Sequence, residues 1–245
     1  GQDYTLIDLP GIYSLTSYTM EEKVSRECIL SDEVDVIIDV ADASSLERNL
    51  YLTMQLMELD IPMVLALNMM DIVEERGMEI DLHRLPEMLG IPVIPVSARK
   101  KTGLSILMHA VAHHKDVLHQ DPLIHHHPGL HSKHRHDHHA EYTMVYTDDI
   151  EDKIDILIER ITHTYPDFPN KRWLAIKYME KDTSASEQWP LDTSDILDCS
   201  YEKDLINQKY DFIEEIIGET LVNKSSREER TDRIDRWLTG KYTGL

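Results

Sequence analysis

The sequence predicts an α/β fold with a parallel sheet, followed by a region that is helical throughout. In the first half, short runs rich in Ile, Val and Leu alternate with segments of helical length. A histidine-rich stretch interrupts this alternation, and after it apolar residues recur only with the helical period. Strands that alternate with helices are typical of a parallel sheet covered on both faces.

Four apolar runs are expected to form buried strands, and four further segments are expected to form helices beside them. The predicted strands are Tyr4–Ile7, Val34–Val40, Met63–Leu67 and Val93–Val96. The predicted helices are Met20–Leu30, Leu46–Leu59, Leu82–Leu89 and Leu104–Ala112. We assign this alternation to a first domain, residues 1–112.

The histidine-rich stretch, residues 113–140, is predicted to be a disordered linker. Nine of the 14 histidines fall between His119 and His139, among prolines and charged residues. Such a composition cannot bury enough apolar surface to fold alone. Imidazole suits Zn²⁺, Ni²⁺, Cu²⁺ and Fe²⁺, so the candidate ligands of a divalent metal are His125, His126, His127, His134, His136, His138 and His139. A plain solvated loop is the alternative, because the histidines have no fixed ligand spacing.

A helical domain is expected over residues 141–245. Its first helix presents one apolar face, made of Ile150, Ile154, Leu157, Ile158 and Ile161. A second helix is predicted at Asn170–Glu180 and a fourth at Thr231–Leu238. The third carries a stripe with the helical period, made of Ile206, Tyr210, Ile213, Ile217 and Leu221.

Composition excludes several classes of function. The net charge of −21 opposes binding to DNA, RNA or an anionic bilayer, each of which requires a basic surface. The two cysteines, Cys28 and Cys199, form no disulfide framework and indicate a reducing compartment. The longest apolar runs have the length of strands, so none of them spans a membrane.

An Asp-x-x-Gly motif follows the first predicted strand. In nucleotide triphosphatases, an acidic residue such as Asp8 at a strand end holds Mg²⁺, usually through water. A glycine such as Gly11 lets a backbone N–H approach the γ-phosphate. A strand followed by a Pro-Gly turn is the simpler interpretation of this tetrapeptide taken alone.

Two further motifs follow the third and fourth predicted strands. The carboxylate of Asp71 can accept the N1–H and the N2 amino proton of guanine, Asn68 can bond the base edge, and Met69 can cover the ring. A backbone N–H at Ser97-Ala98 can point at guanine O6. An Asn/Asp helix cap also explains Asn68–Asp71, but all three motifs fall, in order, at the ligand-binding edge of a parallel sheet.

The chain resembles the ferrous iron transporter B family, whose nucleotide-binding domain has a phosphate-loop GTPase fold. The resemblance rests on DLPGIYSL, on the acidic pair after it, and on DVADASSLERNLYLTMQLMELDIPMVLALNMMD, in which Met69 replaces the Lys of many GTPases. It is strong over residues 1 to about 112. The helical region fits the helical domain that lies between the GTPase domain and the membrane channel of this family.

The resemblance implies GTP or GDP and Mg²⁺ as ligands, and a location at the cytoplasmic face of a bacterial or archaeal inner membrane. It also implies a channel domain in the same polypeptide beyond Leu245, whereas the oligomeric state stays open. The family's Gly-x-x-x-x-Gly-Lys-Ser phosphate loop is absent from the sequence, which begins inside an apparent strand. We therefore expect a sheet truncated at its N-terminus, with Gly1–Gly11 either displaced and poorly ordered or paired with Val34–Val40, and a chain deficient in GTP hydrolysis.

Two other functions remain as alternatives at this stage. A ribosome-assembly GTPase shares the three motifs, but a basic RNA-binding domain would follow its GTPase domain, and the region here is acidic and helical. A non-enzymatic metal-binding or metal-sensing module could be built around the histidine-rich linker.

Overall fold

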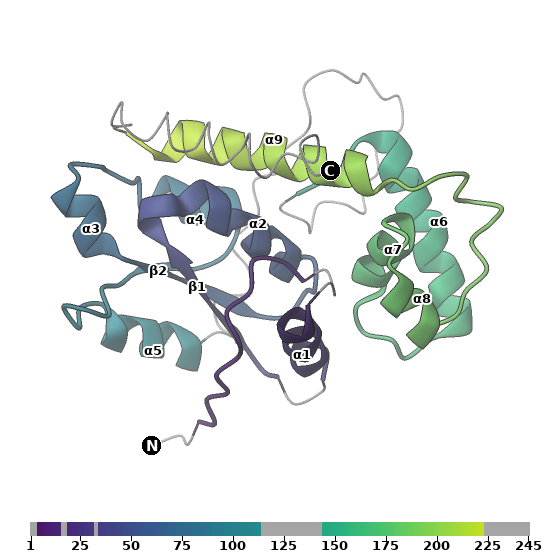
Figure 1. Cartoon of the computed structure of the whole chain (residues 1–245), viewed down its shortest axis with the longest axis horizontal. Helices are drawn as coiled ribbons and strands as arrows, with labels where there is room; N and C mark the ends of the chain where they lie inside the picture. The colour runs from purple at the N-terminus through teal and green to yellow at the C-terminus, as the bar shows by residue number, and fades with distance from the viewer. Residues whose placement is uncertain (1–3, 16–18, 32–33, 114–143, 223–245) are drawn as a thin grey trace.

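The computed structural model describes residues 4–15, 19–31, 34–113 and 144–222 of the chain (Figure 1). The predicted linker histidines from His119 to His139 and the predicted helix Thr231–Leu238 lie outside these residues.

A parallel sheet forms the centre of the first half of the chain. Its strands are β1 (Ile37–Asp42), β2 (Met63–Asn68) and β3 (Val93–Pro95), in the order β1-β2-β3. β1 pairs with β2 along its whole length, from Ile37 opposite Met63 to Asp42 opposite Asn68. The predicted parallel order of the last three strands is confirmed, although β1 begins and ends later than expected.

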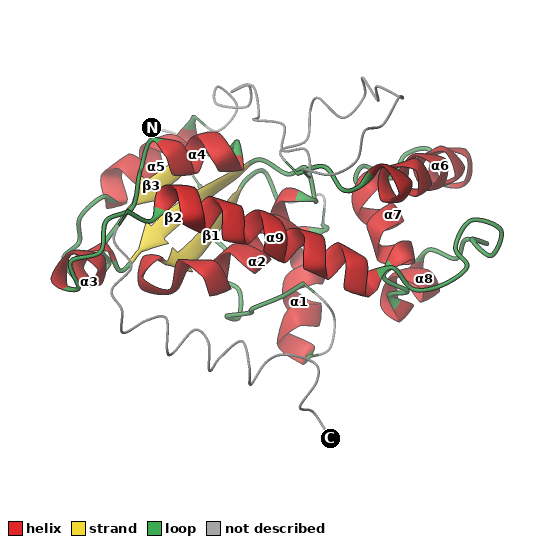
Figure 2. Cartoon of the chain, turned by 90° about the horizontal axis from the view of Figure 1, so that it is seen from above, coloured by secondary structure: helices red, strands yellow, loops and turns green. Residues whose placement is uncertain are grey.

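Helices cover both faces of this sheet, as the strand–helix alternation predicted (Figure 2). One face is covered by α5 (Leu104–Ala112), and the other by α2 (Leu46–Met57) and α4 (Arg84–Leu89). Side chains alternate between the two faces along β2. Val64 and Ala66 therefore pack towards α5, whereas Leu65 and Leu67 pack in the cluster that contains α2 and α4. β2 is therefore buried on both of its faces.

The predicted strand Tyr4–Ile7 is wrong. Residues 4–12 have no regular secondary structure, and Tyr4, Leu6 and Ile7 are 53%, 78% and 51% exposed. Among the described strands, none pairs with this segment. The expected displacement is confirmed, and the alternative pairing with β1 does not occur.

Short helices account for most of the remaining differences. The first helix, α1 (Met20–Ile29), was predicted and begins at a capping box, in which Thr19 and Glu22 each bond the other's backbone N–H. Two six-residue helices, α3 (Met70–Glu75) and α8 (Thr183–Gln188), were not predicted. Less than two turns of helix is too short to display an apolar period.

Three of the four helices predicted in the second half are confirmed, as α6 (Asp148–Thr164), α7 (Lys171–Met179) and α9 (Glu202–Thr220). They do not pack as a separate body. Phe212, Ile213, Ile216 and Ile217 of α9 share a hydrophobic cluster with the sheet, α2 and α4. α9 lies along the same side of the sheet as α2 and α4 (Figures 1 and 2).

The buried face of α9 differs from the predicted stripe. Tyr210 is 44% exposed, while Leu205 and Lys209 are fully buried. Charge pairing explains why a lysine can occupy the core position: Lys209 Nζ lies 3.0 Å from Glu58 Oε1 and 3.5 Å from Glu180 Oε1. Burial alone would lower the pKa of Lys209, but the neighbouring carboxylates raise it well above its usual range.

These ion pairs join three elements that are far apart in the sequence. Glu58 ends α2 and also accepts a hydrogen bond of 2.5 Å from the Tyr146 hydroxyl, and Glu180 follows α7. Lys177 of α7 lies 2.6 Å from Glu180 and supplies a second buried cation. The sheet region and the helical region therefore share a buried ionic contact as well as apolar cores.

We predict that Lys209→Met destabilises the chain by about 3–5 kcal/mol, because it leaves Glu58 and Glu180 short of a buried counter-charge. Urea unfolding measures the loss. Lys203→Met is the matched control, since Lys203 is exposed on the same helix. Equal stability of the two variants would contradict the structural role of the ionic contact.

A second buried charge lies in β1, under α2. Asp39 is 7% exposed and accepts a hydrogen bond of 2.6 Å from the Thr53 hydroxyl. Burial raises the pKa of Asp39 to about 6, although the Thr53 bond opposes the shift. The pKa of Asp39 is higher in the folded chain than the value of 3.8 in the unfolded chain, so the ionised carboxylate destabilises the fold. This destabilisation is complete when the pH exceeds the folded pKa. It disappears when the pH falls below the unfolded pKa.

We therefore predict that Asp39→Asn stabilises the chain by about 3 kcal/mol near pH 7.5, where the carboxylate is ionised. The gain should shrink to nearly nothing near pH 3, because the aspartic acid is then almost wholly neutral in both states. Urea midpoints across this pH range test the effect, with exposed Asp35→Asn as the control. A pH-independent gain would show that charge is not its cause.

Candidate functional site

Two loops meet at the carboxyl edge of the sheet. One is the junction from β2 to α3, where Asn68 ends the strand and Asp71 lies in the first turn of the helix, and the other follows β3 and contains Ser97. The Ala98 backbone N–H donates to Asn68 Oδ1 at 3.1 Å, and the Ser97 hydroxyl donates to Asp71 Oδ1 at 2.7 Å. The structure thus brings together two of the three motifs that the sequence singled out at this edge.

Met69 connects strand to helix in an unusual backbone conformation. Its φ of 65° is left-handed, and its carbonyl accepts from the Ile72 and Val73 N–H groups at the start of α3. This conformation costs a side-chain-bearing residue roughly 1–2 kcal/mol. Non-glycine residues in it cluster at binding sites. The Met69 side chain is 43% exposed beside the two loops, where it could cover the face of a ring.

The carboxylate of Asp71 is held ready in its charged form. Its side chain is only 2% exposed. The Ser97 hydrogen bond holds the pKa of Asp71 below its ordinary value despite burial, and the Arg99 and Lys100 charges contribute in the same direction. At neutral pH, the site therefore presents a fixed anion that accepts hydrogen bonds.

The loop after β3 is shaped by its backbone. Ser97 and Thr102 exchange N–H···O bonds of 3.1 Å, which closes the turn, and Ser97 is 1% exposed. Gly103 follows with φ 77°, and a Cβ there would lie 2.2 Å from the Pro95 carbonyl oxygen. Sequence reasoning missed this glycine, although its place seven residues after Val96, the end of the predicted strand, could have suggested a close approach.

Asp8 and Gly11 do not join this site. Both lie exposed in the segment without secondary structure, and no interaction that the structure describes links Asp8 to Asn68 or Asp71. Within the described ranges, no group of three His, Cys, Asp or Glu residues could hold a metal ion. The expected role of Asp8, holding Mg²⁺ through water, stays a prediction, and the seven predicted histidine ligands lie outside the described residues.

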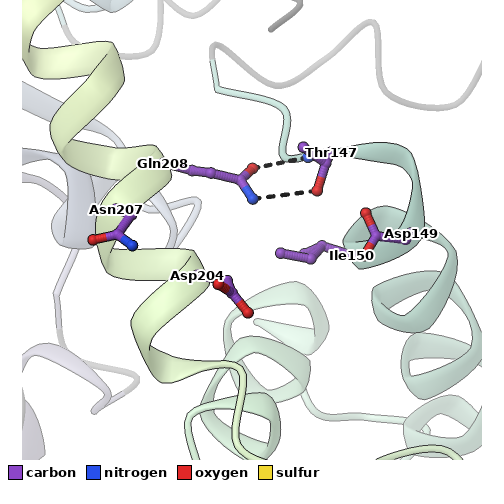
Figure 3. A pocket seen from close by; sticks show the side chains of 6 residues that line it. All are labelled: Thr147, Asp149, Ile150, Asp204, Asn207 and Gln208. Atoms are coloured by element: carbon purple, nitrogen blue, oxygen red, sulfur yellow. Dashed lines mark hydrogen bonds between the residues drawn. The ribbon is translucent and has the colours of Figure 1, made fainter. Parts of the chain in front are cut away.

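A separate cavity of about 340 Å³ lies between α6 and α9 (Figure 3). Its lining consists of Thr147, Asp149, Ile150, Asp204, Asn207 and Gln208. The Gln208 amide accepts from the Thr147 N–H at 2.9 Å and donates to the Thr147 hydroxyl at 3.2 Å. These bonds fasten α9 to the start of α6.

None of the helices in the described part of the chain has the length and apolarity needed to cross a membrane.

The parallel sheet with its polar loops is a GTPase-type fold, followed here by a helical region. The family described as ferrous iron transport protein B matches residues 1–111, and the family described as FeoB cytosolic helical domain matches residues 146–222. The chain belongs to the ferrous iron transport protein B family.

Curated relatives include the Fe(2+) transporter FeoB of Salmonella typhimurium, 30% identical over 258 residues that cover 98% of this chain and 30% of the relative. The Fe(2+) transporter FeoB of Escherichia coli strain K12 is 46% identical over 115 residues, 45% of this chain and 15% of the relative. The chain thus spans at most about a third of the length of these relatives.

Solved structures of the family share the fold. The mGMPPNP-bound NFeoB from S. thermophilus is 32% identical with a TM-score of 0.72, over 89% of this chain and 80% of that chain. The cytosolic domain of the T. maritima FeoB iron transporter in apo form has a TM-score of 0.70 at 23% identity, over 88% and 79%.

Proposed function

We propose that this chain is the guanine-reading part of the cytoplasmic GTPase region of a ferrous iron transporter. In this proposal, residues 1–112 are a partial GTPase domain, residues 113–140 a linker, and residues 141–245 a helical domain. The observation that carries it is the pairing of Asn68 with Ala98 and of Asp71 with Ser97 at the carboxyl edge of the sheet.

Each residue has a defined part in reading the base. Asp71 accepts from the N1–H and the N2 amino group of guanine, a pair of donors that adenine lacks. Met69 covers the ring face. The Ala98 N–H, which is expected to donate a hydrogen bond to guanine O6, donates to Asn68 Oδ1 in this structure. A hydrogen bond from Ala98 to O6 therefore requires that the bond to Asn68 be shared or broken.

In the complete protein, GTP binding and hydrolysis would regulate or drive Fe²⁺ import through a membrane channel in the same polypeptide, at the cytoplasmic face of the membrane. The much greater length of the curated relatives supports this proposal. Homo-oligomerisation is compatible with it. The residue that positions the attacking water is not assigned.

The 245 residues by themselves contain no Gly-x-x-x-x-Gly-Lys-Ser sequence, whose N–H groups and Lys would hold the phosphates. For this reason we propose that the isolated chain binds GTP weakly and does not hydrolyse it. Hydrolysis that exceeds a heat-killed control and disappears in Asp71→Ala would contradict this.

A metal-binding role for the histidine-rich segment is a second proposal, supported by the nine histidines between His119 and His139. Calorimetric titration of the chain with Zn²⁺, Ni²⁺ and Fe²⁺ tests it. If none of these metal ions binds at about micromolar concentration, the metal-binding proposal is wrong and the alternative of a solvated loop is favoured.

The guanine assignment predicts a change of base preference in the complete protein. Asp71→Asn should weaken GDP binding by about ten- to a hundredfold, because a hydrogen-bonded charged acceptor is lost. It should favour xanthosine diphosphate, whose second carbonyl matches the new amide donor. Competition binding of the two nucleotides measures both effects.

Glu74→Gln is the matched control, since Glu74 is an exposed carboxylate on α3 that pairs with Lys100 and does not contact Asp71. If the GDP affinity of Asp71→Asn is unchanged, Asp71 does not bind the guanine base.

A further inference from the structure

The carboxylate that should read guanine is covered. The Asp71 side chain is 2% exposed, and a base could not reach it in this arrangement. Ser97 holds Oδ1 from the buried side of the loop. The other oxygen, Oδ2, faces a side chain that is itself 60% exposed, that of Arg99. Arg99 therefore lies between Asp71 and solvent.

Arg99 also contacts the far end of the same short helix. Its Nε lies 2.6 Å from Asp71 Oδ2, and its Nη2 lies 2.5 Å from Glu75 Oε1. The guanidinium thus spans α3 from its first turn to its last residue. Both Arg99 and Glu75 are more than half exposed, so water and salt can compete for these contacts.

The contact with Asp71 is close but incomplete. Arg99 Nε lies beside Oδ2, yet Oδ2 is left as a buried oxygen for which the structure describes no well-formed hydrogen bond. Buried polar atoms without a hydrogen bond are rare in folded proteins and call for an explanation. Here Arg99 supplies charge without the hydrogen bond, and a purine edge with two donors would supply the hydrogen bond.

We propose that Arg99 is a movable cover over Asp71 that competes with guanine for the carboxylate. While the site is empty, Arg99 neutralises the buried anion. When a base enters, Arg99 swings outwards and stays close through Glu75, and the base donors take over Oδ2. This inference rests on the proposed guanine-reading function, and it adds a residue that opposes binding at the same site.

The proposal predicts that Arg99→Ala binds guanosine about two- to fivefold more tightly than the wild-type chain, the range expected for removing an exposed ion pair. Guanosine is the probe because it is neutral, so repulsion between phosphates and the acidic chain does not enter. Ligand-detected NMR measures the affinity. Raising the salt concentration from about 20 to 500 mM should tighten binding to the wild type and leave Arg99→Ala unchanged.

Lys100→Ala is the matched control. Lys100 is the next residue, and its ammonium pairs with Glu74 at 3.5 Å without contacting Asp71. Its affinity and salt dependence should equal those of the wild type. Thermal unfolding of the variants verifies that each is folded, which is expected because both side chains are largely exposed.

The possible results distinguish the proposed role of Arg99 from the proposed guanine-binding function. Weaker binding by Arg99→Ala would show that Arg99 supports the base, and equal affinity without salt dependence would show that it is a bystander. Either result contradicts the proposed role of Arg99 and leaves the proposed guanine site unaffected. Guanosine binding that is unaffected by Asp71→Asn would overturn the proposed site itself. Lack of guanosine binding by both the wild type and Arg99→Ala would overturn both.

Discussion

The burial of β2 on both faces is the constraint on which the rest of the structure depends. Val64 and Ala66 face α5, and Leu65 and Leu67 face the cluster of α2, α4 and α9, so the strand interior has no room for polar side chains. Only its carboxyl end leaves the core. Asn68 is the last residue of the strand, and the polar groups of both loops gather around it. The position of the site is therefore a direct consequence of how a doubly covered parallel strand must end.

The same constraint explains why the helical region does not form a separate body. The face of the sheet under α2 and α4 needs a further apolar layer, and α9 supplies part of it through Phe212, Ile213 and Ile216. Lys209 on the same face of α9 reaches Glu58 at the end of α2 and Glu180 behind α7. Apolar packing alone would allow the helices to slide, whereas a buried lysine with two carboxylate partners accepts few alternative positions. The sequence boundary between the two regions is consequently not a boundary in the core.

Patterns that involve many residues were predictable from the sequence, and features that depend on a neighbour were not. The parallel order of three strands and the helices α1, α2, α5, α6, α7 and α9 follow from repeated apolar spacing. Tyr4–Ile7 has the composition of a strand but no partner strand among the described residues, and a strand requires a partner. Lys209 could not be recognised as buried, because its burial depends on two carboxylates from distant segments. For the site, the motif spacing predicted that Asn68, Asp71 and Ser97 meet, but nothing in the spacing indicated that Arg99 lies over Asp71.

The charges of the site separate base recognition from phosphate binding. A net charge of −21 repels nucleotide phosphates but hardly affects a neutral guanine ring, and a carboxylate is the group that the ring's N1–H and N2 amino donors require. The cations near Asp71 are already paired, Arg99 with Asp71 and Glu75 and Lys100 with Glu74. These cations stabilise the ionised carboxylate of Asp71 and leave little positive charge to attract nucleotide phosphates. Selectivity for the base can thus be built into these two loops, whereas tight binding of the phosphates requires further N–H groups and a further cation, as a Gly-x-x-x-x-Gly-Lys-Ser sequence supplies.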